Sequence, residues 1–280
     1  MKNRRLIIIL SIFVLLTTII VLCSTVFTLG TITFSWHTTK MYLSEYADSE
    51  IAKDFPMGRS VFLLNKAEIK NTIEAKYPYI EIIKLETKFP NELVVHAAER
   101  VNMYAVTLED DKYAVLDDEN KVLDIITQTQ YDEWDTAKSK KPIVVTVSNN
   151  GGNTPLKQSD FKVGYVANVK RVTSVLATAS STLEEIFWDE ETNDKKVTNT
   201  MIKGWVKSVN IDIAYRSSLN LVVNDEGMKV KVQNCYNELS GKILIGKGAY
   251  DALKTQGKTT GAIVVQGVTL DDCYYLPFDY

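Results

Sequence analysis

The feature that most constrains this chain is a long uncharged stretch near its N-terminus. No Asp, Glu, Lys or Arg occurs from Leu6 to Thr39, and its apolar part, Leu6–Leu29, would measure roughly 36 Å as a helix. That length exceeds a bilayer core of about 30 Å. A signal peptide has a shorter apolar core and a small-residue cleavage site, which is not found after Leu29. The sequence therefore predicts a transmembrane signal anchor over residues 6–30, with the lipid bilayer as a partner through Leu6–Leu29.

Three basic residues stand before this stretch, at Lys2, Arg4 and Arg5. Basic residues beside a membrane span favour the cytoplasmic side. We therefore expect a cytoplasmic tail at residues 1–5 and a single-pass protein of the cell membrane. Everything after the anchor is expected to lie outside the membrane.

The remainder of the chain has the composition of packed domains. The chain is 45% hydrophobic and its net charge is −3, with no block of basic residues. This argues against nucleic acid as a partner and favours proteins over small-molecule substrates. Cys235 and Cys273 could form a disulfide or remain free, and two positions do not decide between these alternatives.

Residues 65–99 show the pattern of a helix followed by a β-hairpin. Asn65 and Glu68 predict a helix start, Ile69 and Ile73 share one face, and Pro78 ends the helix. Two strands are then expected at Ile80–Thr87 and Leu93–Glu99, separated by the turn Lys88–Asn91. The pattern predicts a small α+β module.

The order of several short motifs carries a family resemblance. The residues that define these motifs are Gly58, Phe62, Pro78, Pro90, Glu99, Arg100 and Ala105. In this order, the motifs resemble the POTRA domain of the FtsQ/DivIB cell-division proteins. The resemblance implies a POTRA domain over residues 31–107.

The rest of the chain resembles the second domain of that family more weakly. Strands are expected at 111–116, 121–124, 206–214, 218–223, 228–232 and 243–245, with helices at about 160–187 and 250–254 and a last strand at Ala262–Val265. The predicted fold is α+β: a transmembrane helix, a small POTRA domain, and a mostly antiparallel β domain over residues 108–270. This last domain includes the long helix. Residues 271–280 form a C-terminal tail.

Short motifs that could indicate catalysis do not form a coherent set. Ser159 and Lys162 fit the S-x-x-K pattern of penicillin-binding proteins, but too little chain follows to build both lobes of such an enzyme. Gly246-Lys247-Gly248 is read as a tight turn in preference to a phosphate-binding loop. The two His and three Cys show no zinc spacing. We therefore expect no enzyme activity, catalytic residue, cofactor or metal, and a cell-wall enzyme is the least favoured alternative.

The resemblance implies a non-catalytic scaffold at the division septum. In that family the second domain binds coiled-coil division proteins, FtsL and FtsB or DivIC, and helps to control septal peptidoglycan synthesis. By resemblance, the partner-binding edge is expected at Ala262, Ile263, Val264 and Val265, with Tyr274 and Tyr275 as aromatic anchors. The strand 262–265 could also be an interior one. The alternative function is a POTRA-bearing binding or sensor module for sporulation or secretion.

Overall fold

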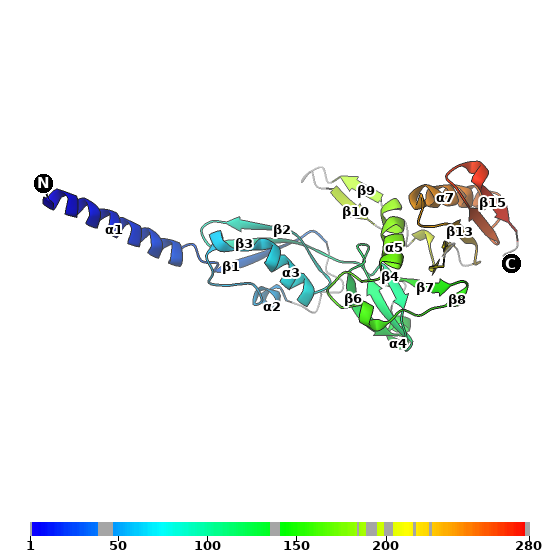
Figure 1. Cartoon of the computed structure of the whole chain (residues 1–280), viewed down its shortest axis with the longest axis horizontal. Helices are drawn as coiled ribbons and strands as arrows, with labels where there is room; N and C mark the ends of the chain where they lie inside the picture. The colour runs from blue at the N-terminus through cyan, green and yellow to red at the C-terminus, as the bar shows by residue number, and fades with distance from the viewer. Residues whose placement is uncertain are drawn as a thin grey trace. The chain divides into compact units, whose positions relative to one another are not determined.

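The protein folds into two compact units, which are described separately here. The computed structural model describes residues 2–38, 47–134, 141–183, 185–188, 195–198, 204–214, 217–223 and 226–277. The first unit is Met1–Arg100 and the second is Val101–Tyr280 (Figure 1). The sequence had placed this boundary at residue 107. It lies earlier because the strand Tyr104–Thr107 pairs with strands of the second unit.

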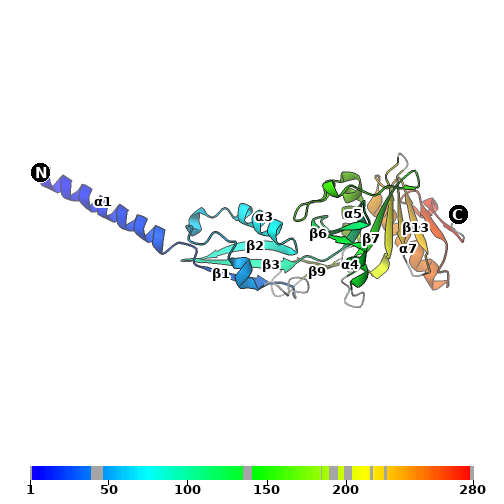
Figure 2. The same ribbon diagram turned by 90° about the horizontal axis from the view of Figure 1, so that it is seen from below.

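The first unit is a three-stranded sheet with helices. Its elements are α1 (Lys2–Thr25), β1 (Thr31–Trp36), α2 (Asp48–Ala52), η1 (Val61–Leu63), α3 (Lys66–Lys76), β2 (Ile80–Lys88) and β3 (Glu92–Glu99). The strand order is β1-β3-β2, with β1 parallel and β2 antiparallel to β3, and α3 packs on β2 (Figure 2). Asn65 caps α3 by accepting a hydrogen bond from the Glu68 amide at 3.2 Å. This is the α+β module that the sequence predicts.

The predicted transmembrane helix is the main correction. The stretch Leu6–Leu29 does not form one continuous rod, because α1 ends at Thr25 and Leu29 is 1% exposed in the core of the first unit. The last apolar residues of the stretch therefore belong to the packed domain. Among the helices of the described residues, none has both the length and the apolar character needed to cross a membrane. The prediction of a transmembrane anchor at residues 6–30 is therefore wrong.

The second unit is built on a mixed sheet of ten strands. They are β4 (Tyr104–Thr107), β5 (Lys112–Leu116), β6 (Val122–Thr127), β7 (Ile143–Asn149), β8 (Gly152–Asn153), β11 (Ser208–Asp212), β12 (Ser218–Val222), β13 (Lys229–Gln233), β14 (Ala262–Val265) and β15 (Cys273–Leu276). The order is β15-β14-β13-β12-β11-β7-β4-β5-β6, with β8 beside β7. The pairs β13–β14, β11–β7 and β4–β7 are parallel and the others antiparallel. The sheet therefore has two edges, β15 and β6.

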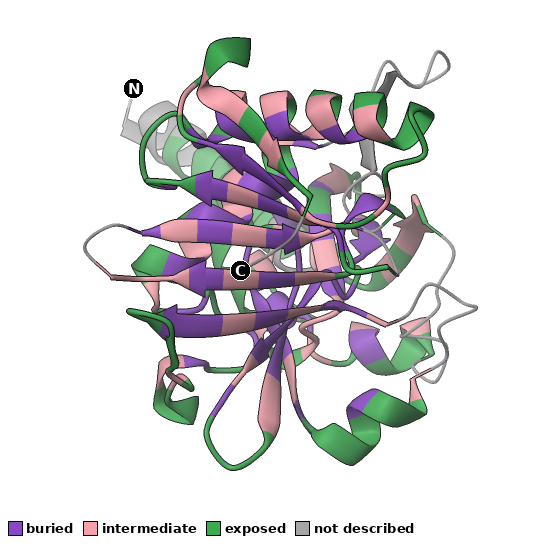
Figure 3. Cartoon of the chain, turned by 90° about the vertical axis from the view of Figure 1, so that its right-hand side faces the viewer, coloured by how far each residue is buried: buried purple, intermediate pink, exposed green. Residues whose placement is uncertain are grey.

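The two longer helices of this unit cover one face of the sheet, and a short helix packs beside β5 and β6. The helices are α4 (Gln128–Glu133), α5 (Lys170–Thr182) and α7 (Leu239–Thr255), with short turns η3 (Gln158–Asp160) and η4 (Leu270–Asp272) and a separate ribbon of β9 (Glu185–Trp188) and β10 (Lys195–Thr198). Val172 and Leu176 of α5 and Ile243 of α7 share one core with strand residues such as Val230. Buried positions alternate with less buried ones along β11, β12 and β13, and such alternation is visible on several strands in Figure 3. That period of two is expected for a sheet with one packed face.

Two helices of the second unit differ from their predicted bounds. The helix expected at about 160–187 forms only as α5, because the chain turns at Gly164, where φ is +85°. The strand expected at 243–245 is instead part of α7, which also includes the helix expected at 250–254. The strands expected at 206–214, 218–223 and 228–232 correspond to β11, β12 and β13. Alternating strands were therefore predicted more accurately than short apolar runs, whose period is ambiguous.

Candidate functional site

The strand predicted as the partner-binding edge is an interior strand. Ala262–Val265 forms β14, which pairs with β13 on one side and β15 on the other. All four residues are at most 4% exposed. Their backbone groups are committed to two neighbouring strands, so this segment cannot accept a further strand. The edge prediction for 262–265 is wrong.

The edge lies one strand further along, at β15, in the segment predicted as a tail. Val264 is opposite Tyr274, and Ile263 is opposite Tyr275. The Gln266 amide donates to the Asp272 carbonyl at 2.9 Å, so Gln266 and Asp272 form a hydrogen-bonded pair of the antiparallel ladder. Because such pairs alternate in an antiparallel ladder, Tyr274 bonds to β14, and the backbone N–H and C=O groups of Tyr275 point away from the sheet.

The two predicted aromatic anchors lie on different faces of β15. Tyr274 is 43% exposed and Leu276 is 38% exposed, which leaves an apolar pair on the open side. Tyr275 packs against the core, and its hydroxyl donates to the Thr260 carbonyl at 2.9 Å. Tyr274 is thus accessible to a partner, whereas Tyr275 holds the strand in place.

Two close contacts fix where β15 runs. At Gly261, φ is +97°, and a Cβ atom there would lie 2.3 Å from the Leu276 carbonyl oxygen, so only glycine fits. At the other end, Thr269 and Asp272 form a reciprocal cap on η4, in which the Thr269 hydroxyl donates to the Asp272 carboxylate at 2.6 Å. The edge strand is therefore held at both ends by local geometry.

The two cysteines of the second unit are free thiols. Cys235 is buried, and Cys273 is half-buried on β15. Burial raises the pKa of both thiols above the usual value. A raised pKa keeps them protonated, so neither has the thiolate character of a reactive cysteine.

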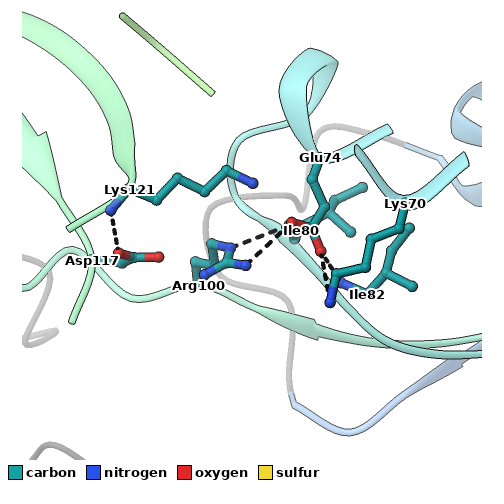
Figure 4. Close-up of polar contacts among 7 residues, drawn as sticks. All are labelled: Lys70, Glu74, Ile80, Ile82, Arg100, Asp117 and Lys121. Atoms are coloured by element: carbon teal, nitrogen blue, oxygen red, sulfur yellow. Dashed lines mark hydrogen bonds and ion pairs between the residues drawn. The ribbon is translucent and has the colours of Figure 1, made fainter. Parts of the chain in front are cut away.

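Arg100 of the family motif has a structural partner that the sequence did not reveal. The Glu74 carboxylate of α3 lies 3.3 Å from the Arg100 guanidinium and also accepts a hydrogen bond from the Ile82 amide at 2.8 Å. Figure 4 shows these contacts, with Lys70 at 3.7 Å from the same carboxylate. Both partners of the pair are under 10% exposed. The pair therefore joins α3 to the end of the hairpin.

The other motif residues are distributed over both units. Glu99 ends β3, and its amide donates to the Thr38 hydroxyl at 2.7 Å. Gly58 has φ +75° in the turn before η1, and Phe62 is 58% exposed. The remaining motif residues are Pro78 after α3, Pro90 in the β2–β3 turn and the buried Ala105 of β4. The motif therefore marks turns and packing and does not converge on one site.

The segments that could indicate catalysis do not have the required geometry. Ser159 lies in the short turn η3, whereas an acylating serine must start a buried helix. Gly246 and Lys247 lie inside α7, so the predicted tight turn at 246–248 is wrong. A Cβ atom on Gly246 would lie 2.6 Å from Val230, which shows that this glycine allows close packing of α7 on β13. Within the described residues, no three His, Cys, Asp or Glu side chains are placed to bind a metal.

Comparison with known proteins supports the family resemblance. No protein-family model matches the sequence. The chain is similar to "Cell division protein DivIB" of Clostridium tetani (strain Massachusetts / E88), with 24% identity over 187 residues. The matched region is 65% of this chain and 60% of that relative. The chain thus spans about 60% of the length of the curated relative it matches, and it is similar to a bacterial cell division protein.

Proposed function

We propose that this chain is a non-catalytic scaffold of the bacterial division machinery. The similarity to a cell division protein supports this role. The family resemblance suggests coiled-coil partners of the FtsL and FtsB or DivIC type, and a role in controlling septal peptidoglycan synthesis at the division septum. The work of such a protein is to bind and position other proteins.

The observation that carries the proposal is the open edge at β15. A sheet edge can add a partner's strand, with main-chain hydrogen bonds giving affinity and alternate side chains giving specificity. β15 offers the outward backbone groups of Tyr275 together with the exposed side chains of Tyr274 and Leu276. An exposed tyrosine is also one of the residue types that dominate binding energy at interfaces. We therefore propose β15, in place of 262–265, as the partner-binding strand.

A matched pair of tyrosine variants tests this site. Tyr274 and Tyr236 are 43% and 41% exposed in the same unit, but Tyr236 lies before α7, away from the edge. Tyr274→Ser should weaken binding to co-expressed FtsL-like and DivIC-like partners by about 2 kcal/mol, or roughly thirtyfold in Kd. Tyr236→Ser should leave binding unchanged. Equal affinities for the two variants would exclude β15 from the interface.

Depletion of the protein in growing cells tests the wider function. A division scaffold predicts filamentous cells with few septa. Normal septa with a sporulation or secretion defect would instead support the alternative envelope module. This experiment does not depend on which strand binds the partner.

A further inference from the structure

One end of the first unit carries an exposed apolar surface that the proposed function does not use. Three segments meet there: residues 26–31, which lead into β1; residues 56–64 around η1; and residues 87–91, which include the end of β2 and the turn to β3. We call this end the aromatic tip. Its exposed apolar side chains are Val26 at 42%, Met57 at 47%, Phe62 at 58%, Leu63 at 82% and Phe89 at 65%.

The aromatic tip is an ordered part of the first unit, because backbone hydrogen bonds join its segments. The Val61 amide donates to the Phe27 carbonyl at 2.8 Å, and the Gly58 amide to the Leu29 carbonyl at 2.9 Å. The Gly30 amide donates to the Asn91 carbonyl at 2.9 Å. The tip therefore presents its side chains from a fixed frame and not from loose loops.

Three phenylalanines form the centre of the tip. The ring centroids of Phe27 and Phe62 are 5.3 Å apart, and those of Phe62 and Phe89 are 5.5 Å apart. Phe62 and Phe89 still leave more than half of their surface exposed. A contiguous exposed apolar patch of this kind marks a binding surface.

The charges of the tip point to its partner. The segments 26–31, 56–64 and 87–91 contain no Asp or Glu, and their two charged residues are Arg59 and Lys88, both exposed. Glu92, the first residue after the turn, lies opposite Lys88 and accepts a hydrogen bond from the Thr33 hydroxyl. Exposed aromatic and aliphatic side chains flanked by cations suit the surface of an anionic lipid bilayer, where rings enter the headgroup region and cations meet phosphates. Arg59 and Leu63 also border a groove along α3, whose acidic residues Asp54 and Glu68 lie outside the three segments of the tip.

We propose that the aromatic tip docks on an anionic lipid surface. Phe62, Leu63 and Phe89 enter the headgroup region, and Arg59 and Lys88 contact lipid phosphates. This is a contact in the plane of the interface, made by turns of a folded domain, and it requires no helix that spans the bilayer.

Hydrogen exchange of the full chain tests the contact at the tip itself. The probe is vesicles of phosphatidylcholine with about 30% phosphatidylglycerol, compared with phosphatidylcholine alone. We expect peptides covering 56–64 and 87–91 to exchange more slowly with the anionic vesicles only. No slowing at the tip with either vesicle would overturn the proposal and leave a protein as the partner of this surface.

Three variants make the test specific. Phe62→Ser with Phe89→Ser should abolish the slowing, while unchanged exchange in 92–99 shows that the first unit remains folded. Val166→Ser with Leu270→Ser removes two side chains of the second unit, exposed by 65% and 76%, and should retain the slowing. Arg59→Gln with Lys88→Gln should reduce it to the level seen with phosphatidylcholine. Slowing that persists in the phenylalanine or the charge variant would contradict the assignment.

Discussion

The two edges of the ten-stranded sheet, β15 and β6, expose their backbones to different degrees. At β6, the Val122 amide donates to the Tyr165 carbonyl at 2.9 Å, and Gly164 donates back to the Val122 carbonyl at 2.8 Å, so a loop covers its first half. The same half of β6 also carries the half-buried side chain of Asp124. In the described part of the chain, no strand or loop covers the outer side of β15 in this way, and its residues Tyr274 and Leu276 are exposed and apolar.

This difference indicates which edge is available to a partner. Proteins block unused edges with covering loops and with charges that point inward, because an open edge pairs with other chains. β6 has a covering loop and the half-buried Asp124, whereas β15 has neither an acidic nor a basic residue from Cys273 to Leu276. The contrast supports β15 as the edge kept open for binding. Substitutions in β14 and β6 and thiol labelling of β15 test this contrast.

A proline in the interior strand should have the largest effect. Val264→Pro removes a ladder hydrogen bond from a strand that is paired on both sides and should destabilise the second unit by about 2 to 4 kcal/mol. Urea unfolding followed by circular dichroism measures this loss. Unchanged stability would mean that β14 is not an interior strand. Because this variant should destabilise the whole second unit, loss of partner binding by it cannot locate the interface.

Removing the carboxylate from β6 should open the blocked edge. Asp124→Val replaces the half-buried charge by a β-branched apolar residue, and we expect concentration-dependent self-association. Light scattering of the variant and the wild-type chain at matched concentrations measures it, with Thr127→Val at the exposed end of β6 as the control. If both variants scatter like the wild type, the loop at 164–166 alone is sufficient to block β6.

The same carboxylate should make stability depend on pH. Burial raises the pKa of Asp124, although a hydrogen bond from the Ile125 amide partly opposes this. The contribution of Asp124 to stability is full below the unfolded-state pKa of about 3.9. It is lost as pH rises through the raised folded-state pKa of this group. Asp124→Asn should therefore stabilise the protein at neutral pH, by under about 1 kcal/mol because the group is partly solvated.

Asp54 of the first unit provides a control of opposite sign. Hydrogen bonds from Lys76 and Tyr77 lower the pKa of Asp54, so its contribution is present above the unfolded-state pKa and is lost as pH falls. Asp54→Asn should destabilise the protein at neutral pH. Urea midpoints across the acid to neutral range separate the two variants. A destabilised Asp124→Asn variant would contradict the first assignment, and a stabilised Asp54→Asn variant would contradict the second.

Thiol labelling should give the smallest but most local signal. Cys235 is 1% exposed, whereas Cys273 is half-buried on the edge strand. In the folded chain, maleimide should modify Cys273 at least about tenfold faster than Cys235, as mapped by mass spectrometry. A partner bound at β15 should slow only Cys273. Slowing at Cys235 alone would place the partner elsewhere on the second unit.

Local signals in the sequence predicted much of the first unit and part of the second. Asn65 and Glu68 define a cap, and the alternation in 206–232 defines strands, because both patterns depend only on neighbouring residues. The run at 243–245 was read as a strand, since three apolar residues cannot distinguish a strand from a helix. The transmembrane prediction was wrong because a hydropathy pattern does not reveal that Leu29 packs in the core of a domain.

The candidate site depended on strand order, which no local pattern contains. The sequence correctly placed a strand at Ala262–Val265 and identified Tyr274 as a candidate anchor, but it did not show that β15 pairs outside β14. Likewise, the Glu74–Arg100 pair joins residues 26 positions apart. The caps, the strands and the resemblance to a division protein can be predicted from the sequence alone, because they depend on local chemistry. The position of the edge strand is visible only in the folded sheet, because pairing between distant segments depends on how the whole sheet packs.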